Sequence, residues 1–274
     1  MVIAFSGWND AGEGATGALN HLMSVWSELS PKILPVLIAE VDPEEFYDFQ
    51  VNRPRVFTDE TSTRSITWPT TKIYGITLAS LDRDLVVVVG EEPSMRWKSF
   101  TQEILDLADD LEVSMVVTVG SLLADVPHSR PISVGITAAN STIADRFNVE
   151  ISSYEGPTGI LGVIHDGCLR HGIDGVALWA PVPHYASGSP SPKVVLALIQ
   201  ALEDLIAISI PQEELELASE AWESEIDNLA REDSDVADYV KALEASKDAM
   251  DIPEVSGEMI AKEFERYLRR KSKD

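Results

Sequence analysis

The chain has 274 residues, enough for one large domain with an appended segment. Its formal net charge of −25 repels phosphate backbones and anionic lipids, which argues against nucleic acid and membrane surfaces as partners. No apolar run is long enough to cross a bilayer and no basic-then-apolar leader precedes Val2, so we expect a cytoplasmic protein.

The single cysteine, Cys168, excludes an internal disulfide and fits a reducing compartment. Because it has no cysteine partner for a metal site, we expect a buried structural thiol. The chain starts almost inside its first strand, so we expect a few further residues before Met1 in the native protein.

An apolar strand and a polar turn open the chain. Residues 2–5 are apolar and predict a buried strand, and residues 11–28 have helical spacing. The turn between them, residues 7–10, lies where open α/β sheets bind ligands. Three glycines imitate a dinucleotide-binding fingerprint but fall inside the helical stretch, so we interpret them as small residues that allow close helix packing: Gly12, Gly14 and Gly17.

The next part of the chain is the least regular. The apolar run 33–41 predicts a second buried strand. Short β segments at 55–58, 66–68 and 73–78 predict an antiparallel excursion or a cover flap. Four aromatic residues here form either a contact surface or a small core under a long loop, and we favour the core: Phe46, Tyr47, Phe49 and Trp68.

Strands and helices then alternate in the order typical of a parallel sheet covered by helices. Strands are predicted at 85–89, 115–119, 132–137 and 175–179, with 150–153 at the sheet edge, and helices at 96–111, 160–171 and 193–207. A loop is expected at 122–131. The sequence therefore predicts an α/β domain with a mostly parallel sheet.

The composition changes at residue 211, where strand signals end and acidic residues become dense. Amphipathic helical stretches follow at 215–229, 236–243 and 255–268. We expect an α/β domain in 1–208 and an acidic helical appendage in 209–274. The apolar faces of these helices pack on one another, on the main domain or on a neighbouring subunit, and the sequence leaves all three open.

Four blocks of the chain resemble the PAC2 family, which includes the eukaryotic proteasome assembly chaperones and many bacterial and archaeal proteins. The blocks are AFSGWNDAG, LLADVPHSRP, SYEGPTGILGVIHD and LWAPVPHY, in that order. The VPH-x-RP and SYEGPTG blocks and the acidic helical tail are most similar to the actinobacterial branch. The resemblance covers residues 1–208.

The resemblance implies a three-layer α/β/α domain similar in architecture to nucleoside phosphorylases and peptidyl hydrolases. It also implies a homo-oligomer, with trimers expected among bacterial members, and a protein client. The eukaryotic relatives act as chaperones that bind proteasome α subunits. No cofactor is expected.

Two family properties do not match these residues. Relatives that dock in proteasome α-ring pockets end in a hydrophobic-Tyr-x motif, whereas this chain ends in Arg-Arg-Lys-Ser-Lys-Asp and Tyr267 is too far from the end. Docking of that kind is therefore not expected. The ATP-grasp label given to prokaryotic relatives is also unsupported, because the chain has no glycine-rich phosphate loop with a lysine and no obvious paired carboxylates for magnesium.

Polar side chains at strand ends and helix starts provide the best site hypothesis. If the strands are parallel, these groups converge on one edge of the sheet. There the helix start at 156–159 would offer N–H groups to an anion, and His184 would act as an acid or base beside Glu155 or Glu91. The expected pocket comprises Asn9, Asp10, Glu91, Glu92, Ser121, Glu155, Thr158, His184 and Tyr185.

Structural roles are the alternative for these residues. Asp10 and Thr158 suit helix caps, the acidic pair 91–92 suits the approach to a helix, and residues 183–185 suit a rigid turn. A triad with Ser121 as nucleophile lacks the second glycine of a nucleophile elbow.

No metal site is expected from the histidines. His165 and His171 are six residues apart, roughly 240° around a helix, so they do not share a face.

Two hypotheses for function follow. The first, which we prefer, is a non-enzymatic binding or assembly protein of the PAC2 type that forms a homo-oligomer and contacts other proteins. The second is an enzyme or sensor that binds a small anionic metabolite in a strand-end cleft.

Overall fold

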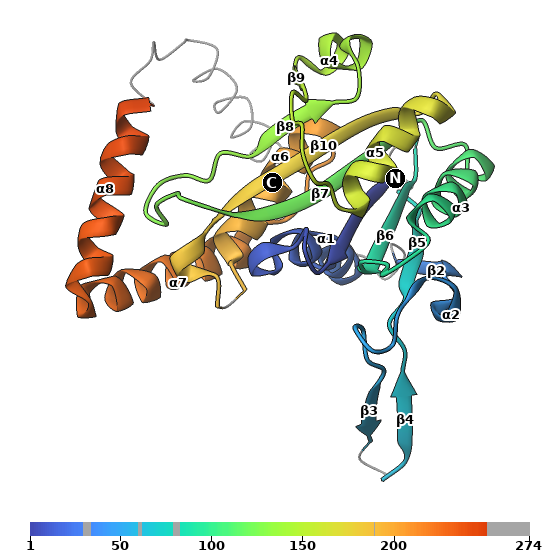
Figure 1. Cartoon of the computed structure of the whole chain (residues 1–274), viewed down its shortest axis with the longest axis horizontal. Helices are drawn as coiled ribbons and strands as arrows, with labels where there is room; N and C mark the ends of the chain where they lie inside the picture. The colour runs from blue at the N-terminus through green and yellow to red at the C-terminus, as the bar shows by residue number, and fades with distance from the viewer. Residues whose placement is uncertain (30–33, 60–61, 79–82, 189, 251–274) are drawn as a thin grey trace.

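The computed structural model describes residues 1–29, 34–59, 62–78, 83–188 and 190–250. An eight-stranded sheet runs through the molecule in the order β2-β5-β6-β1-β7-β10-β8-β9 (Figure 1). Its strands are β1 (Val2–Ser6), β2 (Val36–Glu40), β5 (Thr71–Ile76), β6 (Leu85–Glu91), β7 (Met115–Ala124), β8 (Gly135–Ala138), β9 (Glu150–Ile151) and β10 (Asp174–Pro183). The four central strands β6, β1, β7 and β10 are parallel, which confirms the mostly parallel sheet.

Helices cover both faces of the sheet. On one face, α1 (Gly14–Leu29) and α6 (Pro192–Ile206) bury apolar side chains against the central strands. On the other face, α3 (Trp97–Asp110) and α5 (Ile160–His171) do the same. The expected three-layer α/β/α arrangement is therefore present. In the described ranges, four short helices join these elements: η1 (Ala11–Glu13), α2 (Pro43–Phe46), α4 (Ser141–Phe147) and η2 (His184–Ala186). Of these, α2, α4 and η2 were not predicted.

Gly14 and Gly17 of α1 allow close packing, as the sequence predicted, whereas Gly12 lies before α1 in η1 with a positive φ of 59°. A Cβ at Gly14 would be 2.7 Å from the Val194 side chain, and one at Gly17 would be 2.8 Å from that of Val195. Both valines belong to α6. The glycines therefore bring α1 against α6.

The second strand differs from its prediction. The apolar run predicted a buried strand, but β2 is an edge strand that pairs with β5 alone, and its side chains are mostly exposed. An edge position leaves one side of the strand without a neighbour, which apolar composition alone does not reveal. The end of β7 also differs, because the strand continues to Ala124 and takes in the first residues of the predicted loop.

A two-stranded hairpin projects away from the body of the molecule (Figure 1). It consists of β3 (Arg55–Thr58) and β4 (Arg64–Thr67), paired antiparallel, and we call it the arm. This confirms the predicted antiparallel excursion for the segments 55–58 and 66–68, whereas the third predicted segment, 73–78, lies in the main sheet as β5. Of the aromatic residues near it, Phe46 and Tyr47 are buried in the core on the α3 and α5 face, while Phe49 packs on Trp68 with ring centroids 4.8 Å apart.

Two helices follow the α/β layers, α7 (Glu213–Glu232) and α8 (Ser234–Met250). Trp222 and Ile226 of α7 are buried against Ala186 and Tyr185, so α7 packs on the main body. The third predicted helical stretch lies outside the described residues, and the division at residue 208 stays a prediction. Within the described ranges, no helix has the length and apolar character needed to cross a membrane.

Candidate functional site

The turn after β1 is stabilised by Asp10 and Ser121. Oδ1 of Asp10 accepts hydrogen bonds from the backbone N–H groups of Ala15 (2.8 Å) and Thr16 (3.0 Å), so Asp10 caps α1. Burial raises the pKa of this carboxyl, although these hydrogen bonds oppose the shift. The buried Ser121 hydroxyl donates to the Ala11 carbonyl oxygen (2.8 Å). Both side chains therefore hold the turn in place.

Hydrogen bonds between Asn9, Glu92 and the start of α5 join the ends of β1 and β6 to that helix. The Asn9 Nδ2 donates to Oε1 of Glu92 (2.8 Å), and the same oxygen accepts the backbone N–H of Ile160 (3.0 Å). Gly159 lies so close to the buried Asn9 side chain that a Cβ there would overlap it. The Glu92 carboxylate thus occupies the amino terminus of α5, where the helix dipole favours negative charge. An external anion at 156–159, as the sequence predicted, has no room for the same contact.

Glu91 has different neighbours from Glu92. Its Oε2 accepts a hydrogen bond from Asn52 Nδ2 (2.6 Å), and its carbonyl oxygen accepts one from the Tyr47 hydroxyl (2.9 Å). Consecutive strand residues point to opposite faces, so the two glutamates serve two junctions. Glu91 ties the segment before the arm to β6.

His184 and Tyr185 do not join the other predicted residues. Ser121 pairs with Ala180, and β10 continues three residues further before His184 follows. At the usual rise of a strand, His184 is therefore roughly 13 Å beyond the level of Ser121. Its Nδ1 is 3.2 Å from Oδ1 of Asp125. The predicted convergence is wrong for His184 and Tyr185, and Ser121 and His184 do not form a triad.

Tyr185 instead belongs to a buried cluster around His128, which the sequence analysis did not select. The Tyr185 hydroxyl accepts the backbone N–H of His128 (2.8 Å) and is 2.8 Å from Nδ1 of the same ring. Nε2 of His128 is 3.1 Å from Oδ1 of Asp227 in α7. Burial raises the pKa of Tyr185 to about 12. These contacts fasten α7 to the ends of β7 and β10.

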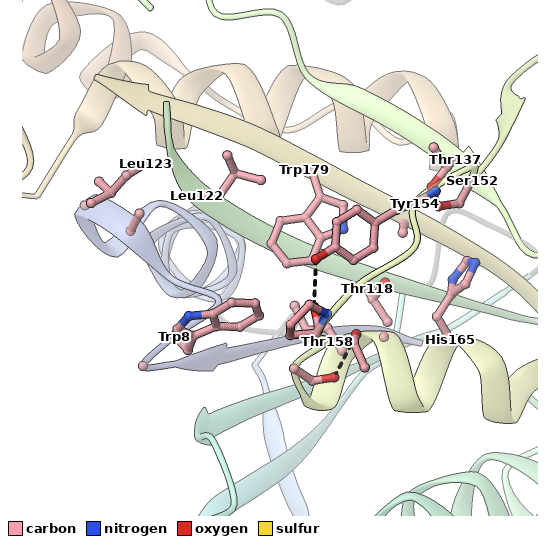
Figure 2. A pocket seen from close by; sticks show the side chains of 18 of the residues that line it. Trp8, Thr118, Leu122, Leu123, Thr137, Ser152, Tyr154, Thr158, His165 and Trp179 are labelled. Atoms are coloured by element: carbon pink, nitrogen blue, oxygen red, sulfur yellow. Dashed lines mark hydrogen bonds between the residues drawn. The ribbon is translucent and has the colours of Figure 1, made fainter. Parts of the chain in front are cut away.

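The last two predicted residues, Glu155 and Thr158, lie in the loop 152–159 between β9 and α5. Glu155 is exposed. The Tyr154 hydroxyl donates to the Pro157 carbonyl oxygen (2.8 Å), which folds the loop on itself (Figure 2). Thr158 alone among the nine predicted pocket residues lines the cavity described next.

A cavity of about 850 Å³ lies between this loop, α5 and the strands β7 and β10 (Figure 2). Small side chains of the two strands leave the space, with Thr118 and Ala177 paired side by side. Gly120 lies under the Trp179 ring, because a Cβ at 120 would be 2.6 Å from it. Trp179 therefore lies across β7 and forms one wall.

His165 of α5 provides the ionisable group of the cavity wall. Both its ring nitrogens are shielded from water. The Ala138 backbone is the hydrogen-bonding group that acts on the ring. Burial lowers its pKa, against the opposing effects of Asp166 and the Ala138 backbone, so the imidazole is neutral at neutral pH. Trp8 and Tyr154, both 67% exposed, flank the cavity.

The chemistry of this lining suits binding. Aromatic and aliphatic side chains dominate, with a few hydroxyl groups and His165, and no described lining residue is Lys, Arg, Asp or Glu. The sequence signal for this cavity is the set of small residues at alternate strand positions: Thr118 opposite Ala177, and Gly120 opposite Trp179.

One cluster of metal-binding residue types occurs in the described part of the chain. Asp106, Asp109 and His171 bring one ligand atom each within 4.8 Å of one another. The two aspartates are exposed, and Nδ1 of His171 is 3.1 Å from the Gly167 carbonyl oxygen. Exposed acidic groups of this kind are common without an ion, so the absence of a metal site stays a prediction.

The family model of the PAC2 family matches residues 4–230. The chain belongs to the PAC2 family. The actinobacterial resemblance is confirmed as well, because a PAC2 family protein from Streptomyces avermitilis is 46% identical with a TM-score of 0.80, over 88% of this chain and 98% of that one.

A second PAC2 relative from an actinobacterium carries a functional description. It is a Mycobacterium tuberculosis protein described as a proteasome-assembly chaperone homologue, 42% identical with a TM-score of 0.78, over 87% of this chain and 98% of that one. An archaeal proteasome activator from Pyrococcus furiosus shares the fold, with 15% identity and a TM-score of 0.63 over 83% and 91% of the two chains. No curated protein matches the sequence.

Proposed function

We propose that this PAC2 protein is a non-enzymatic, assembly-chaperone-like protein that forms a homo-oligomer and binds a protein client. The Mycobacterium tuberculosis relative described as a proteasome-assembly chaperone homologue supports this role. A trimer is the form we expect first. A cytoplasmic location and the absence of nucleic-acid partners remain predictions from the composition.

The arm is the observation that carries the proposal. All residues of β3 and β4 are exposed, including the cross-strand pair Val56 (51% exposed) and Ile66 (56% exposed) and the aromatic Phe57. A lone two-stranded hairpin is marginally stable in water. Exposed apolar side chains on such a hairpin are stabilised when another protein covers them. The arm therefore suits contact with a second chain.

Analytical ultracentrifugation of a paired set of variants tests the oligomer. Val56→Thr with Ile66→Thr keeps β-branched residues in the arm but removes its apolar pair. We expect the wild type to sediment as an oligomer and the double variant to dissociate at least in part. Val51→Thr with Ile151→Thr makes the same two changes at exposed positions outside the arm and is expected to leave the oligomer intact. A monomeric wild type at micromolar concentration contradicts the oligomer.

The client requires a separate measurement. Purified proteasome α and β subunits from the same organism are combined with and without the protein, and the yield of assembled particles is followed by native mass spectrometry. We expect the protein to bind subunits before assembly and to be absent from the finished particle. No binding to either subunit type rules out a proteasomal client.

The alternative, an enzyme or sensor for a small anionic metabolite, has less support. Glu92 occupies the amino terminus of α5, and the described cavity lining has no lysine or arginine to receive an anion.

A further inference from the structure

The cavity beside α5 has features that the proposed protein-binding role does not use. Its volume of about 850 Å³ is within the usual range for small-molecule sites. Strands β7 and β10 line one side of it and α5 another, while the loop 152–159 forms a rim on which the Tyr154 hydroxyl already donates to the Pro157 carbonyl oxygen (Figure 2). The walls are thus formed before any ligand arrives.

We propose that this cavity is a binding site for a neutral small molecule with an aromatic ring system. The inference is independent of the proposed function, because the arm and the cavity are formed by different elements. No step of catalysis is assigned to the site.

The wall chemistry selects a flat ring. Trp179 forms one wall of the cavity, held there by its close contact with Gly120, and Trp8 is an exposed indole beside the opening. Aromatic rings stack or meet edge to face with a gain of about 0.5–1.5 kcal/mol beyond area burial. Leu122, Leu123 and Leu161 complete an apolar lining that offers a ring few polar partners.

The charge pattern selects a neutral molecule. No described lining residue carries a cationic or anionic side chain apart from the titratable His165, so a charged ligand would be buried without a counter-ion. The net charge of −25 also disfavours anions approaching from solution.

Two fluorescent probes with the same rings test the charge and the site. N-phenyl-1-naphthylamine is neutral, and 8-anilinonaphthalene-1-sulfonate adds one sulfonate to the same framework. We expect the neutral probe to bind with saturable, one-to-one stoichiometry, and the sulfonate to bind about tenfold or more weakly because its charge lacks a partner. Equal affinity of the two probes overturns the neutral class, and absence of saturable binding by the neutral probe overturns the site.

Matched variants locate the probe. Trp8→Ala is expected to weaken binding of N-phenyl-1-naphthylamine about tenfold. Trp68→Ala makes the same change at a partly exposed residue that packs on Phe49 near the arm, and is expected to leave binding unchanged. The reverse result assigns the probe to the arm surface and contradicts the proposal.

Discussion

Strands β7 and β10 present alternate residues to two faces that differ in packing. On the α1 and α6 face, Val119 and Leu178 are fully or almost fully buried among aliphatic side chains. On the α5 face of the same strands, Thr118 and Ala177 are too small to fill the space, and a cavity remains beside the Trp179 ring. One pair of strands therefore supplies stability on one side and a shaped space on the other. The following changes test that division.

The largest effect is expected from the packed face. Leu178→Ala removes a fully buried side chain from the α1 and α6 core and should lower the free energy of unfolding by about 2–5 kcal/mol, measured by urea denaturation. Leu122→Ala makes the same change on β7 at a partly exposed residue of the cavity lining and should cost less than Leu178→Ala, about 1 kcal/mol. Equal costs for the two variants contradict the division between the faces.

The second largest effect on the free energy of unfolding is expected at Glu92, which joins the strand ends to α5. Glu92→Leu leaves the Asn9 amide and the Ile160 N–H without their acceptor and should cost about 2–4 kcal/mol of unfolding free energy. Glu92→Gln keeps one acceptor oxygen and should cost less. If both variants are as stable as the wild type, Glu92 is not needed to hold α5 and is free to serve a ligand.

A third prediction concerns the wall of the cavity. Gly120→Ala places a methyl group 2.6 Å from the Trp179 ring, so the ring must move, with an expected cost of about 1–3 kcal/mol and a shift in tryptophan fluorescence. At Gly135 the nearest atom to an added Cβ is the Trp179 carbonyl oxygen at 3.7 Å, an ordinary contact. Gly135→Ala should therefore leave both stability and fluorescence nearly unchanged. An unchanged spectrum in Gly120→Ala contradicts the placement of the ring.

The smallest effect is a pH dependence at the turn after β1. Burial raises the folded-state pKa of Asp10 above the carboxyl's ordinary value of 3.8. The folded state then holds this proton more tightly, so the stabilisation is full below pH 3.8 and is lost as pH rises through the raised pKa. Urea denaturation should therefore show wild type losing stability relative to Asp10→Asn over that window. The opposite slope refutes the shift.

Much of the fold was predictable because it depends on local patterns. A helix following Ile160 and ending near His171 was predicted and is present as α5, since the glycine after it marks its end. The exposure of β2 was not predictable, because an apolar run has the same composition in a buried central strand and in an exposed edge strand. α4 is only seven residues long and has too few turns for a periodic signal.

The candidate site was harder to predict than the fold. Glu92 and Asn9 were expected to meet and do meet, because they follow neighbouring parallel strands. Their role differs, since one contact closes the end of α5 rather than opening a pocket. His165 was examined only as a metal ligand, and its position beside a cavity depends on small residues in two other strands, which no local pattern around it reports.

Cys168 makes the opening of α5, which forms one wall of the cavity, measurable by thiol labelling. The thiol is fully buried in α5, its pKa is raised to about 12, and it is the only cysteine of the chain. Thiolate is the reactive form, so a labelling reagent meets it only after α5 lifts from the sheet. The rate of labelling under native conditions then reports how often α5 opens. A molecule bound beside His165, one turn earlier on the same helix, should lower that rate, and no engineered label site is needed to measure it.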